Sequence, residues 1–283
     1  MSVHARVAQE LHQRITVIEP PSGWKMLNWR ELWAYRELLW VLTARDVKVR
    51  YKQTALGVGW AVLRPFLTMV IFSVVFGQLA KLPSDGFPYP VFVYAGLLPW
   101  TFFAAAIGAS GQSVVGSSHL VSKVYFPRLI IPLASVGAGL MDLLISTCIF
   151  LAMMAWYSVP LTWNLLAAPL LLFAVVFAAL GIGTLLSALT VAYRDFTHVT
   201  PFLVQVWMYI TPVIFPLSLV PEQWRWVMYA NPITGIVEGF RWAFLGKPLD
   251  PMGLAISLGA SVAVFVVGVA YFQKVERQFA DVI

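Results

Sequence analysis

The sequence has little charge and almost no cysteine. Charged residues make up 11% of the 283 residues, whereas soluble domains carry about 25%. A water-soluble globule of this composition would expose large apolar patches and aggregate, so an ordinary soluble domain is excluded. The one cysteine, Cys148, allows no intramolecular disulfide, and the fold must be held by packing. Because Cys148 lies in an apolar run, we expect a buried free thiol.

Several signatures of catalysis and binding are also missing. No G-x-x-x-x-G-K-[ST] stretch is present, so we expect no nucleotide, and no other cofactor, to be bound by this chain. The four histidines are scattered and pair with no cysteine cluster, so no metal site is expected. No catalytic Ser/His/Asp set can be nominated from spacing. The net charge of +6 does not indicate a nucleic-acid partner, because long later stretches carry no Lys or Arg and such binding needs a solvated basic face.

Apolar residues are what the sequence has in abundance. They make up 60% of the chain, and the mean hydropathy is +0.79. A helix that crosses a bilayer needs about 20 mostly apolar residues, and lipid leaves the backbone no partner outside a helix or a closed barrel. We therefore expect an all-α integral membrane protein with six transmembrane helices, between a tail at 1–28 and a tail at 276–283. The expected spans within the domain at 29–275 are approximately 58–80, 91–115, 130–156, 165–191, 201–220 and 252–272.

The placement of Lys and Arg predicts the orientation. If the N-terminus lies in the cytoplasm, the inside segments hold 15 of these residues and the outside segments hold 4. Positive charge is enriched on the cytoplasmic side of membrane proteins. We therefore expect both termini in the cytoplasm, and the first span, rather than a cleaved signal peptide, to direct the chain to the membrane.

Two segments outside the spans are also expected to be helical. In Trp29–Thr43 one helical stripe is apolar, although Trp33 and Val41 depart from it, and this predicts an amphipathic helix at the membrane interface, with a helix packed on its own protein as the alternative. The stripe consists of Leu32, Tyr35, Leu39 and Leu42. Pro221–Asp250 is too apolar for an ordinary loop. Asn231-Pro232 is typical of a helix start and divides it into helices at about 221–230 and 232–245, an outer re-entrant hairpin in which Glu238 and Arg241 could pair.

Asp142 is the most costly residue of the predicted spans. It lies about twelve residues into the third span, where an aspartate costs about 2.5–3.5 kcal/mol. It could line a transport pathway or carry a proton. It could instead make an inter-helix hydrogen bond, with Gln112 or Gln205 as the candidate partner.

Aromatic and basic residues give further candidates. Many aromatic residues would form interfacial belts, but some could line a conduit for sugars, whose faces suit flat rings with a polar edge. A basic run precedes the first span and could contact anionic lipid or the pyrophosphate of a lipid-linked substrate. The conduit candidates are Tyr94, Trp100, Phe102, Phe103, Asp142, Trp207 and Tyr209, and the basic candidates are Arg45, Lys48, Arg50 and Lys52.

A series of short motifs resembles one known family. The run Arg50–Pro65 (RYKQTALGVGWAVLRP) is similar to the opening of the membrane subunits of ABC-type polysaccharide exporters, which export O-antigen, capsule or teichoic acid. Further similarities follow in the family's order over residues 30–275. They are Tyr94–Trp100 (YAGLLPW), Tyr125–Arg128 (YFPR), Tyr193–Asp195 (YRD) and Asn231-Pro232.

The resemblance implies a function and partners. It implies a non-enzymatic permease subunit in the cell inner membrane that pairs with a second copy of itself and with two copies of a separate ATPase subunit, which would bind ATP and Mg. A polysaccharide on a polyprenyl pyrophosphate would pass outward through the homodimer. The resemblance implies ATPase-coupling loops that contain Ser118, His119, Lys123, Tyr125, Arg128, Tyr193, Arg194 and Asp195. An exporter of a drug or small lipid with the same architecture is the alternative, and a membrane-embedded enzyme or a proton-coupled carrier has less support.

Overall fold

The fold is a bundle of long helices. The computed structural model describes residues 29–52, 59–276 and 279, so the predicted tail at 1–28, most of the tail at 276–283 and residues 53–58 of the family-like run lie outside the described residues. Within the described part, five helical stretches are long and apolar enough to cross a membrane. They are α4 (Gly59–Phe72) with η1 (Ser73–Leu79), α5 (Tyr89–Gly116), α7 (Ile130–Trp156), η2 (Trp163–Ala167) with α8 (Ala168–Ala192), and α12 (Pro251–Glu276).

The predicted fifth span, 201–220, has a different form. α9 (Phe196–Ile210) has 15 residues, about 22 Å of helix, which is short of the roughly 30 Å hydrocarbon layer. It ends before Thr211-Pro212 because proline lacks an N–H and disfavours helical geometry at the preceding residue. The segment 201–220 is therefore not one continuous helix, and the count of six spans stays a prediction.

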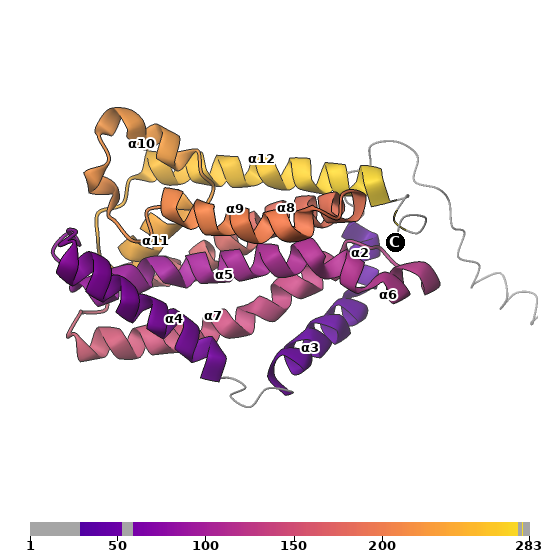
Figure 1. The fold of residues 1–283 in the computed structure, drawn as a ribbon, viewed down its shortest axis with the longest axis horizontal. Coiled ribbons are helices and arrows are strands. Elements are labelled where there is room, and N and C mark those ends of the chain that lie inside the picture. Colours follow the sequence, from indigo (N-terminus) through magenta and orange to yellow (C-terminus); the bar gives the residue numbers. More distant parts are fainter. Residues whose placement is uncertain (1–28, 53–58, 277–278, 280–283) are drawn as a thin grey trace, which may run out of the picture.

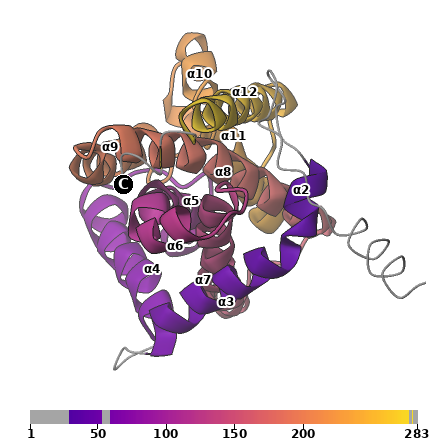
Figure 2. The ribbon, with the colours of Figure 1, turned by 90° about the vertical axis from the view of Figure 1, so that its right-hand side faces the viewer.

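α5 lies at the centre of the bundle. It contacts α4, α7, α8, α9 and α11, and Figure 2 shows it surrounded by the other helices. Glycines bring the neighbouring helices close together: a Cβ added at Gly181 on α8 would lie 2.6 Å from the Cα of Phe265 on α12, and one at Gly183 would lie 2.6 Å from the Ser110 hydroxyl on α5. Such close approach at small residues is typical of helix packing in membranes.

The predicted interface helix is two helices, α2 (Trp29–Ala34) and α3 (Arg36–Lys52). Leu42 on its apolar stripe is buried, and Leu32, Tyr35 and Leu39 pack against the same buried cluster. The stripe therefore faces the protein rather than lipid, as the alternative interpretation had it. Residues outside the stripe, Trp29, Trp33 and Trp40, remain exposed and are suited to a membrane interface.

The outer segment contains a short η3 (Leu217–Leu219), α10 (Glu222–Tyr229) and α11 (Thr234–Leu245). The side-chain Oδ1 of Asn231 accepts the backbone N–H of Ile233 at 3.2 Å, so Asn231 helps to start α11 two residues later than predicted. Almost all of α11 is buried. Whether the pair of helices re-enters a membrane stays a prediction.

The elements predicted to be cytoplasmic gather at one end of the molecule. Figure 1 shows α2, α3, α6 (Ser118–Lys123) and the end of α12 at that end, and α10 at the opposite end.

The prediction that the single thiol is buried is wrong, because Cys148 is exposed. It lies on the outward face of α7 with Met141, Leu144 and Leu151, where an apolar sequence context reflects lipid rather than a protein core.

Candidate functional site

A cavity of about 550 Å³ lies among α3, α4, α5 and α7. Its wall combines two arginines, one carboxylate, tryptophan rings and hydroxyl groups. Ligand sites in proteins have this range of volumes and join apolar walls with a few polar groups. The polar and tryptophan residues of the wall are Arg50, Tyr51, Trp60, Arg64, Thr68, Trp100, Thr101, Asp142 and Ser146.

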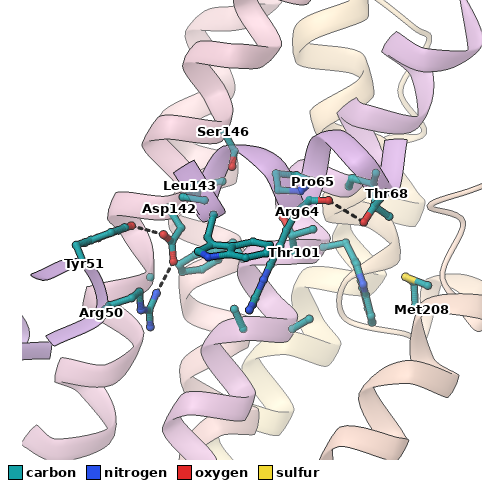
Figure 3. Close-up of a pocket in the computed structure, with 18 residues that line it drawn as sticks. Arg50, Tyr51, Arg64, Pro65, Thr68, Thr101, Asp142, Leu143, Ser146 and Met208 are labelled. Carbon is teal, nitrogen blue, oxygen red and sulfur yellow. Dashed lines mark hydrogen bonds and ion pairs between the residues drawn. The ribbon is translucent and has the colours of Figure 1, made fainter. Parts of the chain in front are cut away.

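Asp142 holds the end of α3 against α7. The guanidinium of Arg50 and the hydroxyl of Tyr51 both donate hydrogen bonds to its carboxylate, and Figure 3 shows both side chains reaching Asp142 from one side. The predicted partners Gln112 and Gln205 are therefore wrong. The Arg50 and Asp142 side chains are 33% and 30% exposed, and the positive charge of Arg50 offsets part of the cost of placing a carboxylate within a span.

Tyr51 serves as a hydrogen-bond donor at this carboxylate. Burial, and then the hydrogen bond to Asp142, raise the pKa of Tyr51 above its ordinary value. The phenol therefore keeps its proton at any physiological pH and continues to donate to the carboxylate.

Arg64 is the second cation of the cavity, and sequence reasoning missed it. Its guanidinium lies 5.8 Å from the centre of the Trp60 ring, a cation–π distance, and residues 29–52, 59–276 and 279 offer it no acidic partner. Trp60, Arg64 and Thr68 are four residues apart along α4 and share one helix face, which borders the cavity. This spacing was visible in the sequence and could have identified that face.

The other residues of the predicted basic run lie elsewhere. Arg45, Lys48 and Lys52 are spaced three and four residues apart and share one face of α3, away from Arg50. Arg45 pairs with the adjacent Asp46 at 2.9 Å, whereas Lys48 and Lys52 are exposed. Of the four, Arg50 is the residue placed in the cavity.

The predicted conduit aromatics are dispersed. Tyr94 and Phe103 are fully buried, with Tyr94 stacked on Phe150 and Phe103 edge-on to Trp207. Both rings are covered by this chain's own side chains. The remaining candidates divide in the following way: Trp100, Phe102 and Asp142 line the cavity, the indole N–H of Trp207 donates to Asn231 at 3.0 Å, and Tyr209 is exposed on α9.

Six of the eight predicted coupling residues are exposed, and Arg128 and Ser118 are half-buried. The backbone N–H of Arg128 donates to a carboxylate oxygen of Glu276 at 3.2 Å, and its guanidinium bonds the Glu276 carbonyl and lies 6.0 Å from the Phe279 ring. Arg128 therefore joins the α6–α7 loop to the end of α12. The exposed members are His119, Lys123, Tyr125, Tyr193, Arg194 and Asp195.

A buried ionic network fixes the outer end of the molecule. Arg241 is fully buried, and its guanidinium donates to Glu238 and to the Val213 carbonyl, both at 2.7 Å. Lys247 lies 2.8 Å from both Glu238 and Asp85. Burial alone would raise the pKa of Asp85, but the hydrogen bonds from Lys247 and Ser218 outweigh burial and lower it. The predicted Glu238–Arg241 pair is confirmed, and the network joins α11 to the loop before α5.

Comparisons with known proteins agree with this architecture. Residues 37–245 match the family described as ABC-2 type transporter. The chain is 29% identical to the O-antigen export system permease protein RfbA of Myxococcus xanthus, over 89% of this chain and 97% of that protein. It is 25% identical to the polysialic acid transport protein KpsM of Escherichia coli, over 70% and 77%. It is 28% identical to the inner membrane transport permease YadH of Escherichia coli K12, over 72% and 81%.

Proposed function

Because this chain belongs to the ABC-2 type transporter family, we propose that it is the membrane permease subunit of an ATP-driven exporter of cell-surface polysaccharide. The observation that carries the proposal is the similarity to an O-antigen export permease over 89% of this chain and 97% of that relative. The family match itself covers residues 37–245, which include the outer pair α10 and α11. The similarity to a polysialic acid transport protein supports the same class of cargo.

The energy for export comes from a separate ATPase subunit in this proposal. The sequence contains no phosphate-binding loop of its own, so ATP and Mg would be bound by that partner. The exposed residues of the α6 loop and of the α8–α9 link lie at the same end of the molecule. They offer exposed groups at which the ATPase can dock and move the helices.

A second copy of the chain would complete the conduit. The first spanning stretch, Gly59–Leu79, is buried over 17% of its most apolar window, the lowest share among the five described spans. One side of α9 is exposed and apolar as well, with Phe202, Val206 and Ile210 among its residues. Two such faces would meet across a homodimer, and the lipid-linked polymer would pass between the copies.

The membrane would be the cytoplasmic one, with both termini in the cytoplasm. The 15 to 4 distribution of Lys and Arg supports this orientation. The gathering of α2, α3, α6 and the end of α12 at one end of the molecule is consistent with it.

An exporter of a drug or small lipid is the second candidate. It is favoured by the 28% identity to a relative described only as an inner membrane transport permease. That similarity covers 72% of this chain, less than the 89% covered by the O-antigen permease, so the polysaccharide cargo has the stronger support.

Deletion and reconstitution test the proposal. A strain that lacks this gene should lose a surface polysaccharide and accumulate the lipid-linked polymer inside, and the wild-type gene should restore export. The purified chain with its ATPase in liposomes should hydrolyse ATP faster when the lipid-linked polymer is present. Normal surface polysaccharide in the deletion strain would contradict the proposed cargo.

A further inference from the structure

The cavity between α3, α4, α5 and α7 has the composition of an anion site. Arg50 and Arg64 supply two positive charges and Asp142 supplies one negative charge, which leaves a net charge of +1. Thr68 and Thr101 lie on the same wall, but their hydroxyl groups donate to the backbone carbonyls of Arg64 and Leu98, so the arginines are the groups that can bind an anion. Figure 3 shows Arg64 and Thr68 on α4 across the cavity from the Arg50–Asp142 pair, so groups from separate helices surround one space.

The Asp142 carboxylate already accepts a hydrogen bond from the Arg50 guanidinium, the group that an incoming anion would need to bind. Arg50 and Tyr51 both direct their hydrogen bonds to it. A phosphate group presents the same kind of acceptor oxygens with more charge, and arginine binds carboxylates and phosphates in similar geometry. A phosphate in the cavity would therefore compete with Asp142 for Arg50.

We propose that this cavity binds the diphosphate of a polyprenyl-linked glycan, and that Asp142 is an internal competitor that holds the empty site in a paired state. The proposal rests on the proposed function and names the chemistry recognised at one site of it. Arg64 and Arg50 bind the phosphates, and Tyr51 donates either to Asp142 or to the ligand.

An exposed tryptophan explains why a sugar-bearing lipid suits the cavity better than phosphate alone. Trp60 lines the same space as the two arginines and is exposed, whereas Trp100 on the same wall is buried. An indole ring can cover the C–H face of a sugar while its N–H bonds a hydroxyl. The volume of about 550 Å³ exceeds what a diphosphate fills and leaves space for the first sugar beside it.

Displacement of Asp142 would also change how the helices pack. The Arg50 and Tyr51 bonds tie the last turn of α3 to the middle of α7, and the earlier part of α3 packs through Leu42 into the cluster that contains Val121 of α6. A bound phosphate would repel the Asp142 carboxylate and release this tie. Ligand binding would thereby reach the predicted ATPase-docking end of the molecule.

Equilibrium binding to the full chain tests the proposal. The chain is placed in nanodiscs of neutral phosphatidylcholine, and radiolabelled polyprenyl diphosphate is the probe. The variant D142N should bind the probe about five- to tenfold more tightly because the competitor has lost its charge, and R64Q should bind about tenfold more weakly. The matched control is K48Q, which removes one positive charge from an exposed position on α3 and should change affinity less than about twofold.

Competition identifies the source of the phosphate. Inorganic pyrophosphate should displace the labelled lipid, and should do so at lower concentration from D142N than from the wild type. Phosphatidylglycerol should displace it poorly. Displacement by phosphatidylglycerol as readily as by unlabelled polyprenyl diphosphate would overturn the assignment in favour of a general anionic-lipid site.

Two further results would overturn the proposal. Unchanged or weaker binding to D142N, in protein that elutes as the wild type does in size exclusion, would make Asp142 a structural tie and not a competitor. Equal losses of affinity for the probe in R64Q and K48Q would indicate that the probe is attracted to the basic surface as a whole and not to the cavity. Failure in these binding experiments, while the deletion strain still loses its polysaccharide, refutes the site and leaves the proposed function standing.

Discussion

Two arginine–glutamate pairs with the same three-residue spacing lie in consecutive helices, in very different surroundings. Arg241 and Glu238 on α11 are 0% and 8% exposed, whereas Arg225 and Glu222 on α10 are 36% and 88% exposed. Removing one partner of a buried pair leaves an uncompensated charge and costs about 3–5 kcal/mol. An exposed pair contributes less than about 1 kcal/mol, because water already solvates both groups.

The variant R241A should therefore unfold at a much lower temperature than the wild type. The variant R225A should unfold at nearly the same temperature as the wild type. The variants remove the same side chain from the same sequence spacing, so burial is the difference between them. Thermal unfolding of the purified protein in detergent is the measurement. Equal midpoints for both variants would mean that the network around Arg241 does not stabilise the outer end.

Single residues also define the limit of sequence reasoning at the site. The cost of Asp142 and the excess of positive charge at the end of α3 could both be read from the sequence. Their pairing could not, because Arg50 and Asp142 are 92 residues apart and many helix arrangements satisfy the same hydropathy. Arg128 gives the same lesson, since its contacts with Glu276 and Phe279 depend on how α12 ends.

At the scale of elements, the contacts distinguish Arg128 from Arg194, although the sequence analysis predicted both to lie in ATPase-coupling loops. Arg128 joins the α6–α7 loop to α12, whereas Arg194 is exposed in the α8–α9 link, where the described part of the chain gives its guanidinium no acidic partner. Charge reversal at Arg194 should abolish stimulation of the partner ATPase without disturbing the fold. Charge reversal at Arg128 should first disrupt the cluster around Phe279.

Two measurements on the same preparations distinguish these effects. Size exclusion and thermal unfolding report the fold, and polymer-dependent ATP hydrolysis with the ATPase subunit reports coupling. We expect R194E to retain the wild-type elution and melting while ATP hydrolysis loses its dependence on polymer. Wild-type coupling in R194E would remove this link from the docking surface, and wild-type melting in R128E would show that the Glu276 contact is dispensable.

Helix boundaries followed from the sequence wherever a span was a simple apolar run. The third predicted span, 130–156, coincides with α7 at Ile130–Trp156, and the second lies within two residues of α5. The fifth failed at Thr211-Pro212, since hydropathy continued through a point where the backbone could not continue as a helix. The stripe on α3 was recognised, but amphipathicity alone does not tell whether lipid or protein covers it.

At the scale of the whole molecule, the described chain leaves two apolar faces exposed on the same side. Figure 2 shows α4 and α9 bordering one flank of the bundle. Ile71 on α4 and Val206 on α9 are 57% and 40% exposed. In a two-fold symmetric dimer, if residue i of the first copy contacts residue j of the second, then residue j of the first copy also contacts residue i of the second. The two faces can therefore meet as α4 against α9 across the symmetry axis.

Cross-linking between two differently tagged copies tests this arrangement. Both copies carry C148S, which removes the exposed native thiol; one copy also carries I71C and the other V206C. A short bismaleimide reagent should join the two tags in membranes, because the cysteines face each other across the dimer. The matched control replaces V206C with L170C on α8, an exposed position outside α4 and α9, and should give no product. Equal cross-linking at both positions, or none at either, would contradict an α4–α9 interface and require the conduit to be sought along another face.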